Sequence, residues 1–111
     1  MSSFVPISGT LLSPTCVRLT GTSITDIFTA DDNFDTVFAV YLTNETAGAV
    51  TCLVDWFDGT TNNHIHNASV VANGVSSYEH PIKMVNAQKI RATAGTGNAI
   101  TVTVHRVKAQ R

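Results

Sequence analysis

The chain has 111 residues, enough for one domain with a single hydrophobic core and too few for two. Apolar residues make up 43% of it and charged residues only 14%, where an ordinary soluble domain carries about a quarter, so its surface is either rich in Thr, Ser and Asn or partly covered by partners. The formal net charge is −1, and the longest apolar runs have about six residues, which excludes a membrane-spanning helix of about 20.

The first 14 residues are predicted to form an extended N-terminal arm. Pro6, Gly9 and Pro14 interrupt its apolar residues and no basic residue precedes them, which argues against a secretory signal. We therefore expect a product that is made in a cytoplasm and is not secreted. In that setting Cys16 and Cys52 should stay reduced, with a disulfide between them as the alternative.

Residues 15–111 are predicted to form one β-sandwich domain. Val, Ile and Thr dominate the segments, and turn residues interrupt them every 8 to 12 positions, a spacing typical of all-β proteins. Eight antiparallel strands follow, with jelly-roll or immunoglobulin-like order. Their ranges are 15–20, 23–29, 36–43, 49–57, 64–70, 75–80, 88–94 and 99–107.

The sequence predicts more about two pairs of these strands. Segments 36–43 and 49–57 are apolar at both odd and even positions, so each should lie in the centre of a sheet with its outer face covered by something else. Segments 88–94 and 99–107 alternate cleanly between apolar and polar residues. Joined by "GTGN", they are predicted to pair as a hairpin with one solvated face.

Acidic and basic residues are separated along the chain. All eight acidic residues lie at or before Glu79, and six of the seven basic ones lie at or after Lys83. Either these charges pair across the sheets of one molecule, or a basic edge meets an acidic partner. The second interpretation makes the following residues candidates for a partner interface: Lys83, Lys89, Arg91, Arg106, Lys108 and Arg111. No Phe, Tyr or Trp follows position 80, which argues against nucleic-acid binding.

His64 and His66 are the only candidates for a metal site. Two residues apart on a strand, they are expected to share one face, with His80, His105, Asp55 and Asp58 as distant completing ligands. Thr, Asn and Ser surround them, and no metal-binding motif supports the pair. A solvated strand face is the favoured interpretation, in which Ile65 points inward, and no metal is predicted.

The case for a catalytic site is equally weak. The chain has no Gly-x-Ser-x-Gly elbow, and "AGTGNA" precedes a strand where a phosphate loop would need a helix. Asp31 and Asp32 stand beside Asn33 in a predicted solvated turn. We therefore predict no catalytic residue, no cofactor and no enzymatic activity.

Carbohydrate binding is the alternative from another functional class. Sugar-binding sandwiches stack a ring on an exposed aromatic, and Trp56, Tyr78 and the loop "DGTTNN" offer suitable side chains. Trp56 lies in a strand predicted to be central, however, so the core is its favoured place.

The pattern of residues 36–108 resembles a known group of proteins. The runs "VTCLVDWFDG" and "NASVVANGVSSYEHPIKMVNAQKIRATAGTGNAITVTVHRV" resemble the small β-sandwich subunits of tailed bacteriophages and gene-transfer particles. In that group a strand with an aromatic residue is followed by a short turn, here Ala72 to Gly74, then by a strand ending near "PI" and a last strand like "NAITVTV". The resemblance implies a virion structural protein without a catalytic site, whose N-terminal arm embraces a neighbouring subunit.

Taken together, these features predict a phage virion protein that forms homo-oligomers and binds the major capsid protein or other virion proteins, with assembly in the host cytoplasm and no membrane partner. Decoration or cementing of the head is the favoured role. A head-to-tail connector or a tail or fibre attachment subunit is the alternative, and a carbohydrate-binding module that recognises a surface glycan is the further one.

Overall fold

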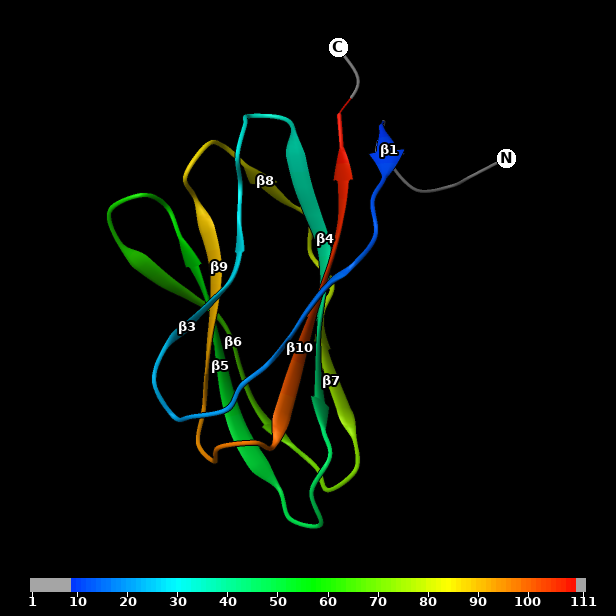
Figure 1. Ribbon diagram of the computed structural model, residues 1–111, viewed down its shortest axis with the longest axis vertical. Coiled ribbons are helices and arrows are strands. Elements are labelled where there is room, and N and C mark those ends of the chain that lie inside the picture. Colours follow the sequence, from blue (N-terminus) through cyan, green and yellow to red (C-terminus); the bar gives the residue numbers. More distant parts are fainter. Residues whose placement is uncertain (1–8, 110–111) are drawn as a thin grey trace.

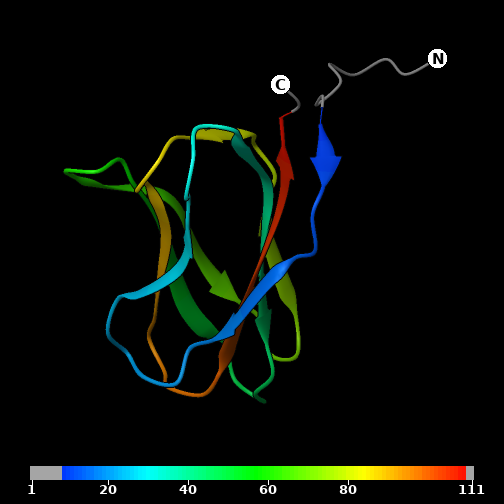
Figure 2. The same ribbon diagram turned by 45° about the horizontal axis from the view of Figure 1, so that its top comes forward.

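The computed structural model describes residues 9–109, which fold into a β-sandwich of two antiparallel sheets (Figures 1 and 2). The all-β sandwich is confirmed, with ten strands where eight were predicted. The strands are β1 (Thr10–Leu11), β2 (Thr15–Arg18), β3 (Thr25–Thr29), β4 (Asp35–Asn44), β5 (Val50–Phe57), β6 (Asn62–Val70), β7 (Val75–Tyr78), β8 (Ile82–Met84), β9 (Lys89–Ala94) and β10 (Ile100–Lys108). Between residues 9 and 109 there is no helix that could cross a membrane.

The strands divide into a six-stranded and a four-stranded sheet. The six-stranded sheet has the order β1-β10-β4-β7, in which β2 also pairs with β10 and β8 with β4. The four-stranded sheet has the order β3-β9-β5-β6. Strands β4 and β5 each lie between two neighbours, which confirms the prediction that segments 36–43 and 49–57 are central.

Alternate residues of the two sheets fill the core. Val40, Leu42 and Val102 of the six-stranded sheet face Val54 and Ile90 of the four-stranded sheet, and all five side chains are fully buried. Val and Ile suit a pleated surface of this kind because their branched side chains pack well against cross-strand neighbours. The period of two in the sequence therefore generates one continuous apolar layer.

The predicted hairpin of the last two strands is wrong. Strand β9 pairs with β3 and β5, whereas β10 pairs with β1, β2 and β4, so the connector at residues 95–98 carries the chain from one sheet to the other. The N–H of Gly95 donates to the carbonyl of Thr51, and that of Asn98 to the carbonyl of Leu19. A strand buried on one face alternates in the same way whether its neighbour in sequence lies beside it or across the core, so the pattern could not decide between the two arrangements.

One of the strands, β1, lies within the predicted N-terminal arm. Within residues 9–14, β1 pairs with the end of β10, and the N–H of Leu12 donates to the carbonyl of Arg106. Residues 1–8 of the predicted arm lie outside the described residues, so its extension over residues 1–14 stays a prediction. Strand β8 was not predicted because it has only three residues and follows Pro81 directly.

Candidate functional site

An aromatic cluster occupies the middle of the outer face of the six-stranded sheet. His105 of β10 lies between two residues of β4, with ring centroids 5.9 Å from Phe38 and 5.3 Å from Tyr41. The register shifts here, so that His105 pairs with Ala39 and Arg106 with Val37, and Phe38 is left as the extra residue of a bulge. The three side chains are half-buried. We call Phe38, Tyr41 and His105 the aromatic face.

The surroundings of the aromatic face are mostly neutral. Thr101 and Thr103 of β10 stand opposite Thr43 and Tyr41 of β4, and the Sγ of Cys16 lies 3.6 Å from the hydroxyl of Thr103. At one end the guanidinium of Arg18 is 2.9 Å from the carboxylate of Glu45, so that this pair has no net charge. The doubly apolar segment 36–43 had predicted such a face, and within residues 9–109 no third layer covers it (Figure 2).

Two of the predicted interface residues pair internally on the four-stranded sheet. Lys89 and Arg91 lie 2.8 and 2.7 Å from the two carboxylate oxygens of Asp26 on β3. The hydrogen bond from Lys89, supported by that from Arg91, lowers the pKa of Asp26. The Arg91 guanidinium also stacks over the ring of Phe57 at 4.2 Å.

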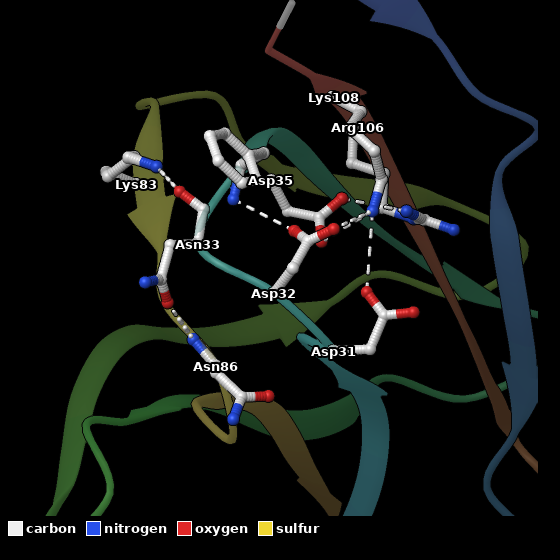
Figure 3. Close-up of polar contacts among 9 residues, drawn as sticks. Asp31, Asp32, Asn33, Asp35, Lys83, Asn86, Arg106 and Lys108 are labelled. Atoms are coloured by element: carbon white, nitrogen blue, oxygen red, sulfur yellow. Dashed lines mark hydrogen bonds and ion pairs between the residues drawn. The ribbon is translucent and has the colours of Figure 1, made fainter. Parts of the chain in front are cut away.

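Three more predicted interface residues gather where β4 begins and β10 ends (Figure 3). The ammonium of Lys108 lies 2.7 Å from Asp32, 3.4 Å from Asp31 and 3.6 Å from the fully buried Asp35, and its pKa is raised, mainly by the hydrogen bond to Asp32. Nη1 of Arg106 donates to Oδ1 of Asp35 at 2.9 Å. Lys83 donates to the carbonyl of Asn33.

These contacts show where the acidic and basic residues, which are separated along the sequence, meet in the fold. Pairing across the sheets of one molecule is observed for Lys89, Arg91, Arg106 and Lys108, while Arg111 lies outside the described residues. The carboxylate oxygens of Asp31, Asp32 and Asp35 lie within 4.8 Å of one another, a spacing that suits a cation, and the Lys108 ammonium already contacts all three. A role for the six residues in binding a partner stays a prediction.

The prediction that the two histidines of β6 share one face is wrong. His66 pairs with Val54 and His64 with Asp55, so Ile65 is the extra residue of a bulge and reverses the alternation. Nδ1 of His64 lies 2.5 Å from Oδ1 of the buried Asp55, whereas Nε2 of His66 lies 3.0 Å from the hydroxyl of Ser76 on β7. The two imidazoles therefore point to different partners. Ile65 packs against the core, as predicted.

The side chains considered for sugar binding make contacts within the fold. Trp56 packs against the core, which confirms its predicted place. In the loop "DGTTNN", Asp58 accepts hydrogen bonds from the backbone of Thr60 and Thr61 and from Asn63, and these bonds lower its pKa. Tyr78 lies between the rings of His66 and His80. A shallow hollow of about 330 Å³ on the four-stranded sheet has no aromatic residue in its lining, which includes Thr22, Thr51, Leu53, Asn67, Thr93 and Gly95.

The two cysteines lie in different sheets and are free. Cys16 of β2 is exposed and Cys52 of β5 is buried. Burial raises the pKa of the Cys52 thiol to about 11, because a thiolate is poorly solvated in the core. Only Cys16 is placed to react with reagents in solvent.

No family model and no curated protein matches the chain. Among solved structures, a subunit of Bacillus endospore appendages, described as a family of disulfide-linked pili, superimposes with a TM-score of 0.57 at 17% identity over 99% of this chain and 98% of the other. A pentameric capsid protein from metagenomic phage sequences gives a TM-score of 0.50 at 15% identity over 96% of this chain, which spans 64% of that protein. At these identities the likeness concerns the fold.

Proposed function

We propose that this chain is a non-enzymatic structural subunit of a bacteriophage particle, and that it decorates or cements the head by binding capsid subunits and further copies of itself. The aromatic face carries the proposal. Phe38, Tyr41 and His105 lie together on a sheet surface that no further layer of residues 9–109 covers. A connector or a tail attachment subunit would use the same surface, and the pentameric phage capsid fold supports a particle role of this class.

The chemistry of this surface suits contact with protein. Aromatic residues are enriched in the centres of protein interfaces, and charged residues are depleted there. Arg91, Arg106 and Lys108 each form an ion pair within the molecule. Burial of the aromatic face would therefore not remove water from any of these charges while it is unpaired. Many copies, each adding a modest buried area across the joints between capsid subunits, would raise the resistance of the shell to internal pressure.

Cosedimentation with particles that lack the chain tests the proposal. The double substitution Phe38→Ser with Tyr41→Ser should weaken binding to the particles at least tenfold, because it removes two aromatic anchors. Leu53→Ser is the matched control, since Leu53 is a half-buried apolar residue on the outer face of the other sheet. Unchanged binding by the double variant, or an equal loss in the control, would refute the assignment of this face. A density map of the source particle would then distinguish head from connector and tail.

A further inference from the structure

Three carboxylates converge where the connector between β3 and β4 leads into β4 (Figure 3). Asp31 and Asp32 lie in this connector and Asp35 is the first residue of β4. One carboxylate oxygen of each lies within 4.8 Å of those of the other two. Two oxygens bound to a single calcium ion are at most about 5 Å apart, because each lies about 2.5 Å from the ion. We call Asp31, Asp32 and Asp35 the carboxylate cluster.

The buried member of the carboxylate cluster has one oxygen that accepts no hydrogen bond. Oδ1 of Asp35 accepts a hydrogen bond from Arg106, whereas no N–H or O–H group within residues 9–109 donates to Oδ2. Oδ2 faces the ammonium of Lys108 at 3.6 Å, which is too far for a hydrogen bond. A buried acceptor is costly unless a partner satisfies it. Independently of the spacing, Oδ2 of Asp35 therefore indicates a site for a cation that can approach more closely.

Lys108 brings a tethered cation to the carboxylate cluster, but one that satisfies it incompletely. Its ammonium lies 2.7 Å from Asp32 and makes longer contacts of 3.4 Å to Asp31 and 3.6 Å to Asp35. The ammonium and the guanidinium of Arg106 supply two positive charges to three carboxylates, so one negative charge is left over. The Lys108 side chain is 32% exposed on a flexible four-carbon stem, so its ammonium can turn into solvent.

Hydrogen bonds fix the connector that carries two of the carboxylates. Oδ1 of Asp32 accepts from the N–H of Phe34 at 2.9 Å. The side-chain oxygen of Asn33 accepts from the N–H of Asn86 at 2.9 Å, and its carbonyl accepts from Lys83 (Figure 3). Because the connector is already ordered, a cation that binds there would cost little conformational entropy.

We infer that the carboxylate cluster binds a calcium ion, which displaces the ammonium of Lys108. Calcium takes about six to eight oxygen ligands in flexible geometry, and water can complete the set because the Asp31 side chain is 84% exposed. Exchange of one positive charge for two would neutralise the cluster and give Oδ2 of Asp35 a partner. Magnesium fits less well, since it requires octahedral geometry and gives up its water reluctantly. None of these side chains belongs to the aromatic face, so calcium binding is independent of the proposed function.

Calorimetric titration of the full chain with calcium chloride, at about 0.15 M salt, provides the test. One ion should bind per chain, and at ten times the dissociation constant calcium should raise the midpoint of thermal unfolding by about 5 °C. Magnesium chloride at the same ionic strength should raise it by less than half as much. Asp31→Asn and Asp32→Asn should each weaken calcium binding about tenfold or more. Asp26→Asn is the control, because it removes a carboxylate from the four-stranded sheet, and it should bind calcium as the wild type does.

Lys108→Met tests the displacement of the ammonium. This variant should bind calcium about tenfold more tightly than the wild type, because the ion no longer competes with a tethered cation. Lys83→Met is the matched control, since its ammonium lies beside the same connector but is bound by the carbonyl of Asn33, and its affinity should stay within about threefold of the wild type. An equal gain in the two variants, or a wild-type chain that takes up no calcium at about 10 mM, would overturn the inference.

Discussion

The guanidinium of Arg106 meets the carboxylate of Asp35 inside the sandwich, with Nη1 2.9 Å from Oδ1 and the Asp35 side chain fully buried. Arg106 also lies over the ring of Phe28, at 4.7 Å, so it joins the two sheets where β4 begins and β10 ends. A buried carboxylate keeps its charge at low cost only while a cation remains beside it.

Arg106→Met should therefore lower the free energy of unfolding by about 3 kcal/mol, because it leaves Asp35 buried with only the more distant Lys108 ammonium. Urea unfolding measures the change. The exposed pair of Arg18 and Glu45 gives the control, and Arg18→Met should cost less than about 1 kcal/mol. Combining Arg106→Met with Asp35→Leu should restore much of the loss. Equal effects at Arg106 and Arg18 would contradict the importance of the buried pair.

Asn44→Asp should lower the unfolding free energy by about 3 kcal/mol, because the substitution replaces an amide donor to the carbonyls of Gly48, Val70 and Val71 with a carboxylate that repels them. Thermal unfolding followed by circular dichroism reports the change. Asn67→Asp on the exposed part of β6 should shift stability by less than about 0.5 kcal/mol. A small effect at Asn44 would mean that other contacts hold the β4–β5 connector to the β6–β7 connector.

The fold could be predicted from the sequence where burial alone decides the pattern. The segments that became β4 and β5 are apolar on both faces, and this placed them in the centres of their sheets. The sequence pattern does not reveal which strands pair with one another. Strands β9 and β10 alternate identically whether they pair or face each other across the core, so their separation into two sheets depended on hydrogen bonds to distant strands.

The arrangement of side chains at the candidate sites depends even more on the register between strands that are distant in sequence. Single extra residues at Ile65 and Phe38 create bulges, and a bulge reverses the alternation from which the face of His64 or His66 was predicted. The Asp35 and Arg106 pair joins residues 71 positions apart. Charge segregation along the chain indicated that acids and bases would meet, but the choice of partners required the positions of the strands.

Stability should depend on pH through Asp26. Its folded pKa is lowered from the ordinary value of 3.8, so the charged form stabilises the fold above that value, and this contribution is lost as the pH falls through the folded pKa. Asp26→Asn should therefore be less stable than the wild type at about pH 6, and the difference should shrink at about pH 2. Urea midpoints of both proteins at the two pH values check this. A difference that grows in acid would contradict the pairing with Lys89 and Arg91.

Thiol reactivity should separate the two cysteines. At about pH 8 an aromatic disulfide reagent should modify Cys16, which is exposed on β2, and leave Cys52 untouched, because Cys52 is buried and its pKa is raised to about 11. Absorbance of the released thiolate should therefore report one thiol per folded chain and two after unfolding in guanidinium. Cys16→Ser should show no reaction until the chain unfolds. Rapid labelling of Cys52 in folded Cys16→Ser would mean that β5 opens to solvent far more readily than its central place in the sheet allows.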